Sequence, residues 1–215
     1  MNILYLQYIL GVAFLMIVFL HVTKKNTDAI IAFGSQSLVI VVLLFNSFLK
    51  TDNLSLLFIV LLTLIVKVIL APIFFSTLIK KHELPFSVNT YLNTPVTLGI
   101  IAIVTAVAHS KKFLSLTTII PDHQILLSLA LSMILLSFFL IVNHKGALAQ
   151  IIGILSLENS IVAFTLFAGL EQSIALQLGI IFDIFVWLII STVFVSMIYK
   201  HFRSLDVTSM AHLKD

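Results

Sequence analysis

Residues 54–79 read LSLLFIVLLTLIVKVILAPIFFSTLI, and this stretch decides the fold class. It contains a single charged residue, Lys67. A helix needs about 20 predominantly apolar residues to cross the hydrocarbon core of a bilayer. The stretch is long enough to do so, and it therefore predicts a transmembrane helix.

The whole chain has the same character. Of its 215 residues, 60% are hydrophobic and 10% are charged, and its mean hydropathy is +1.20. Soluble domains carry about 25% charged residues, so this chain has too few ions to cover a surface in water. The absence of cysteine excludes disulfide scaffolds and cysteine-ligated zinc or iron–sulfur centres. The basic residues lie in short, separate loops, which argues against a nucleic-acid partner.

Short polar breaks divide the chain into apolar runs of about the length of a membrane span. We read seven such runs, at residues 3–22, 29–49, 54–79, 94–110, 124–143, 147–170 and 173–199. The fourth is the weakest, because Pro95 and Gly99 lie near its start and Ser110 ends it early. The predicted fold class is an all-α integral membrane protein with about seven transmembrane helices.

Positive charge predicts the orientation of the spans. The loops after the first, third and fifth spans, together with the C-terminal tail, hold eight lysine and arginine residues, and the opposite side holds three. The eight are Lys24, Lys25, Lys80, Lys81, Lys145, Lys200, Arg203 and Lys214, and the three are Lys50, Lys111 and Lys112. This excess predicts an outside N-terminus and a cytoplasmic C-terminus.

Three ionisable residues lie deep inside predicted spans: Lys67, Glu158 and Asp183. Each costs about 2.5–3.5 kcal/mol at a helix centre on insertion scales. Glu158 and Asp183 lie equally far from a tight turn centred between Leu170 and Glu171, at a depth of roughly 19 Å for a rise of 1.5 Å per residue. Lys67 has a similar depth in the third span. We therefore expect two acids and one base in one plane near the middle of the bilayer.

Two interpretations of these charges stay open. In the first, Lys67 forms a structural salt bridge with one acid and locks helices together, which leaves the other acid unexplained. In the second, Glu158, Asp183 and Lys67 form a proton relay. A buried carboxyl group can bind and release a proton near neutral pH, and a neighbouring lysine can tune that exchange.

Two features support the candidate site. Pro72 cannot donate a backbone hydrogen bond to Val68, so we expect the third span to bend one turn beyond Lys67; a packing kink without function is the alternative. The sixth span carries small and polar residues that permit close helix approach and hydrogen bonds. They are Gly153, Ser156, Asn159 and Ser160. Asn159 is the one that we expect to touch the site.

Three histidines fall near span ends on the predicted cytoplasmic side: His21, His144 and His201. Two of them could face each other as axial haem ligands. Their position beside lysines at helix ends favours histidines of the membrane interface instead. We expect no cofactor in this chain.

Several segments resemble hydrogenase-4 component E proteins. The segment GILSLENS at residues 153–160, which contains Glu158 and Asn159, is similar to the glutamate segment of that family. The similarity continues in GIIFDIF at residues 179–185, in Lys67 with Pro72, and in the tail from Leu205-Asp206-Val207 to Leu213-Lys214, so it covers nearly the full length.

The last three predicted spans also resemble the small three-helix K-type subunit of respiratory complex I. Two buried glutamates lie on adjacent helices of that subunit, in the hydrophilic axis that crosses the membrane arm. Glu158 corresponds to the first and Asp183 to the second, although Asp183 is one methylene shorter. The resemblance divides the chain into a four-helix membrane part (1–119), a K-subunit-like three-helix part (120–200) and a cytoplasmic tail (201–215).

The resemblance implies a non-redox subunit in the membrane arm of a group 4 hydrogenase or formate hydrogenlyase-type complex, in a prokaryotic inner membrane. Its partners would be antiporter-like membrane subunits and a hydrogenase-type peripheral arm. Nickel–iron and iron–sulfur centres would lie on those partners, so this chain would catalyse nothing alone. Two other functions stay open: a structural scaffold whose charges only pair helices, and a free-standing secondary transporter.

Overall fold

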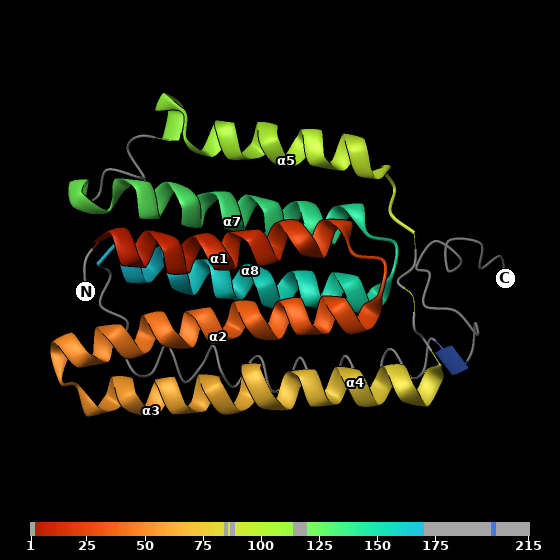
Figure 1. Cartoon of the computed structure of the whole chain (residues 1–215), viewed down its shortest axis with the longest axis horizontal. Coiled ribbons are helices and arrows are strands. Elements are labelled where there is room, and N and C mark those ends of the chain that lie inside the picture. The colour runs from red at the N-terminus through yellow and green to blue at the C-terminus, as the bar shows by residue number, and fades with distance from the viewer. Residues whose placement is uncertain (1–2, 84–85, 87–88, 114–119, 170–198, 201–215) are drawn as a thin grey trace, which may run out of the picture.

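The computed structural model describes residues 3–83, 86, 89–113, 120–169 and 199–200, and this part of the chain is helical apart from short connections (Figure 1). The α-helices are α1 (Ile3–Val22), α2 (Asn26–Thr51), α3 (Leu54–Thr63), α4 (Ala71–His82), α5 (Thr94–Ala108), α7 (Gln124–Asn143) and α8 (Ala147–Phe167). A π-helical segment, η1 (Leu64–Leu70), joins α3 to α4. Two 3₁₀ turns, η2 (Lys111–Phe113) and η3 (Pro121–His123), follow α5 and precede α7. The predicted seventh span, except its last residue Tyr199, and the tail lie outside the described residues.

Five helical segments of the described chain are long and apolar enough to cross a membrane. They are Ile3–Val22, Asn26–Thr51, Leu54–His82, Pro121–Asn143 and Ala147–Phe167. These segments coincide with five of the predicted spans and confirm the all-α membrane class. The fourth predicted span, 94–110, is the shorter helix α5 of 15 residues. Its length of about 22 Å is less than the hydrocarbon thickness of about 30 Å.

Local sequence signals set the helix ends. Asp52 adopts a left-handed conformation (φ 47°) after the last turn of α2, and the side chain of Asn53 then caps α3. Glu83 ends α4 in the same conformation (φ 51°). The side chain of Asn93 caps α5, whose first turn contains a proline. Side-chain caps satisfy backbone N–H groups that a helix start leaves without partners. Two residues, Asp52 and Asn53, are therefore enough to connect α2 to α3.

The helices lie side by side along the long axis of the molecule (Figure 1). α1, α2, α7 and α8 pack together in the centre, the run α3–η1–α4 packs along α2, and α5 packs against α7. Each of the two hydrophobic cores contains residues from both 1–119 and 120–200. The two predicted parts therefore share one interior.

With α3–η1–α4 counted as one run, successive helical runs alternate in direction, so α1, α4 and α7 end where α2, α5 and α8 begin (Figure 1). Hydrogen bonds hold this end together: Asn26 Nδ2 donates to the carbonyl of Phe86 at 3.0 Å, and the Tyr91 N–H donates to the carbonyl of Asn143 at 2.9 Å. Five lysines lie at this end: Lys24, Lys25 and Lys145 in the connections between helices, and Lys80 and Lys81 in the last turn of α4. Lys50 lies in the last turn of α2, and Lys111 and Lys112 lie in η2 after α5; both helices run the other way.

Apolar side chains lie on the outer surface as well as in the two cores. Large apolar side chains such as Tyr8, Ile31 and Val142 are exposed, as expected for a surface in contact with lipid. Polar side chains are buried among α2, η1 and α8, namely Gln36, Ser37, Lys67, Ser156, Asn159 and Ser160. Because polar groups inside a membrane bundle are costly unless they are paired, this cluster is the candidate site.

Candidate functional site

Lys67 lies at the centre of the buried cluster. Its residue is 1% exposed, and its Nζ donates a hydrogen bond to Asn159 Oδ1 at 2.9 Å. Glu158 Oε1 lies 3.7 Å from the same nitrogen. A buried charge is tolerated only when partners replace the water it has lost. An amide oxygen and a carboxylate supply that replacement here, both from α8.

The π-helical segment η1 places Lys67 in the middle of an irregular turn. Pro72 has no N–H to offer the carbonyl of Val68, and the irregularity lies in the turn before it. The N–H of Ala71 bonds the carbonyl of Val66, five residues earlier, which is the π pattern. A bend was predicted one turn beyond Lys67; the irregularity that the structure shows is the π-helical segment between α3 and α4, which contains Lys67 and ends at Leu70. A Cβ built on Gly34 of α2 would lie 3.4 Å from Pro72, so α2 packs closely at this turn.

Asn159 joins three elements. Its Oδ1 accepts from Lys67 on η1, and its Nδ2 donates to Ser37 Oγ on α2 at 2.9 Å. Asn159 and Ser37 are both fully buried. The amide therefore fixes the distance between the lysine-bearing turn, α2 and α8, and it does so with both of its polar atoms engaged.

Glu158 lies at the edge of the cluster. Its side chain is 22% exposed, whereas that of Lys67 is 2% exposed. The distance of 3.7 Å between Lys67 Nζ and Glu158 Oε1 is that of an ion pair and is longer than a hydrogen bond. The carboxyl group therefore has a less enclosed position than the ammonium group that it faces.

A second set of hydrogen bonds extends the cluster across α8. Ser156 Oγ donates to Gln36 Oε1 at 2.8 Å, and Ser160 Oγ donates to the backbone carbonyl of Ser156 at 2.7 Å. Ser160 Oγ also lies 3.3 Å from Ser137 Oγ on α7. Gln36 is fully buried, and its Nε2 has no hydrogen-bond partner. Hydroxyl and amide groups thus extend from the Lys67 cluster toward α7.

The structure brings three of the five predicted site residues into direct contact: Lys67, Glu158 and Asn159. Pro72 lies one turn from Lys67 and shapes its helix without joining the polar contacts. Asp183 lies outside the described residues, so its predicted place beside Glu158 stays a prediction.

Sequence reasoning missed the contributions of α2 and α7. The polar segment GSQS at residues 34–37 interrupts the apolar run of the second span, and this was the available signal for Gln36 and Ser37. No comparable signal marked Ser137, because single serines are common in membrane helices and cost little there. The small and polar residues of α8 are predicted mainly to pack, and Ser156 and Ser160 also make hydrogen bonds.

The arrangement can hold a proton at either of two places. Transfer of a proton from Lys67 Nζ to Glu158 would turn an ammonium–carboxylate pair into an amine and a carboxylic acid, without a change in net charge. Asn159 would stay bonded to the lysine nitrogen in both forms, because an amine N–H can also donate to its Oδ1.

Comparisons with protein-family models, with curated proteins and with solved structures find no match for this chain.

Proposed function

We propose that this chain is a non-redox membrane-arm subunit of a hydrogenase-4 or formate hydrogenlyase-like complex, and that its buried charges take part in proton movement. One observation carries the proposal: a fully buried lysine whose ammonium group lies 2.9 Å from an amide oxygen and 3.7 Å from a carboxylate. The resemblance of the segments around Lys67, Glu158 and Asp183 to component E proteins supports the class of complex.

The relay needs three balanced steps. Lys67 gives a proton to Glu158, which leaves a neutral pair. Glu158 passes the proton onward, and Asp183 is the acceptor that we propose on the adjacent predicted span. Lys67 then takes up a proton from the other side, which restores the ion pair. The partial exposure of Glu158 supports its role as the group that exchanges with a further carrier.

The proposed class of complex also implies a topology, a membrane and a set of partners. We infer seven spans in a prokaryotic inner membrane, with the N-terminus outside and the C-terminus in the cytoplasm. Antiporter-like subunits and a hydrogenase-type arm are the partners, and nickel–iron and iron–sulfur centres on those partners carry the redox chemistry. The gathering of lysines at one end of the described helices supports the proposed orientation.

A structural scaffold is the competing function, and one observation favours it. The contacts of Lys67 with Asn159 and Glu158 join η1 to α8, two elements far apart in the chain, and this linkage alone would stabilise the bundle. Removing one partner of a buried ion pair is destabilising by about 3–5 kcal/mol in soluble proteins, because it leaves the other charge without compensation.

Assembly and proton movement separate the two functions. Glu158→Gln keeps the size and hydrogen bonding of the side chain but removes its exchangeable proton, so a relay would fail in complexes that still assemble. A scaffold would instead lose assembled complex in Glu158→Gln and regain it in the double variant Lys67→Met with Glu158→Gln. Glu83→Gln, which alters an exposed carboxylate beyond α4, is the matched control.

The measurement is proton uptake into vesicles that contain equal amounts of each purified complex. Loss of uptake in Glu158→Gln with normal assembly and normal uptake in Glu83→Gln supports the relay. Normal uptake in Glu158→Gln removes Glu158 from the pathway. Rescue of assembly by the double variant would make the scaffold the better account.

A further inference from the structure

A cavity of about 190 Å³ lies at the lysine-rich end of the described helices, away from the Lys67 cluster. The end of α1, the loop between α4 and α5, the start of α5 and the turn between α7 and α8 enclose it. The loop is attached on both sides, by a backbone bridge between Lys25 and Phe86 and another between Thr90 and His144. The volume is many times what a single water molecule needs.

His21 is one of the residues that line this cavity, and one of its ring nitrogens has no partner. Its residue is 4% exposed, its Nε2 donates to the carbonyl of Leu136 at 3.1 Å, and its ring stacks on Phe139 with centroids 4.9 Å apart. Nδ1 has no hydrogen-bond partner. Buried polar atoms are nearly always paired, so an unpaired nitrogen on a polar cavity points to a ligand.

The charge of the surroundings favours an anion. Lys24 lines the cavity, and Lys25 and Lys145 lie next to the lining residues Lys24 and His144 in the chain; among the described residues that line the cavity, none is a carboxylate. Thr94, the first residue of α5, lines the cavity, and a helix N-terminus carries a partial positive charge; the ends of α1 and α7 also reach the cavity, so the lysines supply most of the positive charge there. The nearest acids along the chain are Asp28, in the first turn of α2, and Glu83, after α4.

The polar groups of the wall suit a phosphate group. Thr23 and Thr94 bring hydroxyl groups, and Asn89 brings an amide. When neutral, His21 Nδ1 can accept a hydrogen bond from a P–O–H or headgroup hydroxyl, and when protonated it can donate to a phosphate oxygen. A phosphate group can therefore form a hydrogen bond with His21 Nδ1 whether the imidazole is neutral or protonated.

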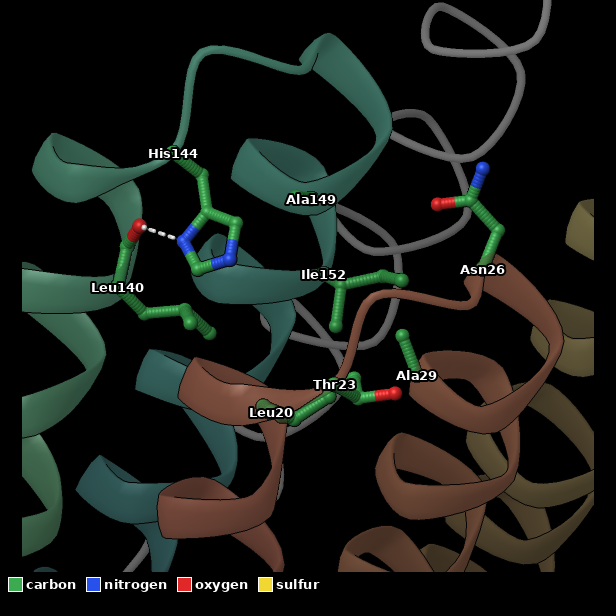
Figure 2. Close-up of a pocket in the computed structure, with 8 residues that line it drawn as sticks. All are labelled: Leu20, Thr23, Asn26, Ala29, Leu140, His144, Ala149 and Ile152. Carbon is green, nitrogen blue, oxygen red and sulfur yellow. Dashed lines mark hydrogen bonds between the residues drawn. The ribbon is translucent and has the colours of Figure 1, made fainter. Parts of the chain in front are cut away.

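A second cavity, shown in Figure 2, shares Thr23 and His144 with the first but lacks these properties. Its volume of about 10 Å³ is about what one water molecule requires. Leu20, Ala29 and Ile152 form most of its apolar wall, and His144 Nδ1 is already bonded to the carbonyl of Leu140 at 3.1 Å. Of these two cavities, the larger is the one that has both the orphan nitrogen and the lysine.

We propose that the larger cavity binds a phosphate group, either the headgroup of an anionic phospholipid or free inorganic phosphate. Lys24 pairs with the negative oxygens at the rim, and His21 holds the group from inside. Basic pockets at the cytoplasmic ends of membrane helices are where anionic headgroups bind in general. The site is separate from the Lys67 cluster and does not depend on the function proposed for that cluster.

The test uses the purified full chain in nanodiscs of phosphatidylcholine alone or with phosphatidylglycerol, and in detergent with or without inorganic phosphate. Retained lipid is measured by native mass spectrometry and stability by thermal unfolding. We expect retention of phosphatidylglycerol over phosphatidylcholine, and about a fivefold loss of this preference in Lys24→Gln. His21→Gln, which keeps a donor for Leu136, is expected to weaken retention further.

Lys112→Gln, at the opposite end of α5, is the matched control. Because Lys24 is exposed at the rim, its variant keeps the helix packing and the test stays decisive even if His21→Gln unfolds. Stabilisation by inorganic phosphate without lipid identifies the free ion as the ligand. The proposal is wrong if neither phosphatidylglycerol nor phosphate has an effect, or if Lys24→Gln and Lys112→Gln lower retention equally, because that result describes attraction to the whole surface.

Discussion

Replacement of Asn159 by alanine tests how the buried cluster is held together. The change removes the acceptor that lies 2.9 Å from Lys67 Nζ and the donor that lies 2.9 Å from Ser37 Oγ. The change leaves Glu158 in place, so Lys67 keeps its ion pair with Glu158 at 3.7 Å. Lys67 loses the 2.9 Å hydrogen bond that joins it to α8.

The cost can be worked out from these two contacts. A hydrogen bond to a charged group contributes about 1.5–3 kcal/mol in soluble proteins, and a neutral one contributes about 0.5–1.5 kcal/mol. Hydrogen bonds between membrane helices contribute about 0.6 kcal/mol on average and about 1.7 kcal/mol at most. Two bonds therefore give about 2–4.5 kcal/mol on the first scale and about 1.2–3.4 kcal/mol on the second. The overlap of the two ranges, about 2–3.4 kcal/mol, is the expected loss in the free energy of unfolding.

The assay is reversible unfolding of the full chain in mixed micelles with increasing dodecyl sulfate, followed by the loss of helical circular dichroism. Ser137→Ala is the matched control, because its buried hydroxyl donates to the carbonyl of Met133 in its own helix at 2.9 Å and reaches α8 only through a 3.3 Å contact with Ser160. We expect this control to lose about 0.6 kcal/mol or less. Equal stability of Asn159→Ala and Ser137→Ala would refute the view that Asn159 anchors Lys67.

Two further predictions concern packing and orientation. Gly153→Ala would place a Cβ 2.7 Å from Ile141 Cγ1 and 3.3 Å from its backbone nitrogen, so we expect a loss of about 1–3 kcal/mol in the same unfolding assay. Gly11→Ala meets nothing within 4 Å and is expected to be neutral or stabilising by about 0.5–1 kcal/mol; a loss in both variants would contradict the close approach of α7 and α8. Reporter fusions after Glu83 and after Lys145 are expected to report a cytoplasmic location, and an outside signal from both would reverse the orientation.

The fold was largely predictable because bilayer thickness constrains the sequence. Apolar runs of the required length predicted the five long helices to within a few residues at most ends. The fourth run was predicted at 94–110; the helix begins at its predicted first residue, after the Asn93 cap, and ends two residues early at Ala108. Composition measures how apolar a run is, whereas caps decide how many of its residues become helical.

The candidate site was predictable only in part. Counting residues from the span ends placed Lys67 and Glu158 at one depth, and the structure brings them within 3.7 Å. Depth says nothing about rotation around a helix axis, so it could not determine that Asn159 contacts both Lys67 and Ser37. Pro72 predicted an irregularity in the third span, but the sequence pattern did not show that it would be a π-helical segment containing Lys67.

The histidines show the same limit. His21 and His144 were expected at the membrane interface, and they do lie at the ends of helices, with ring centroids 6.3 Å apart. Their sequence positions gave no indication that the loop between α4 and α5 would fold over them and enclose a cavity. Loops of this kind are positioned by long-range contacts, such as that between Asn26 and Phe86.

The number of protons moved per electron pair transferred tests the central claim most directly. The ratio is measured in sealed vesicles that contain the whole complex, with wild type, Glu158→Gln and the exposed control Glu83→Gln at equal amounts. We expect Glu83→Gln to match wild type and Glu158→Gln to lose proton movement while its complex remains assembled. An unchanged ratio in Glu158→Gln would contradict the account, because a side chain without an exchangeable proton would then serve as well as the carboxyl group.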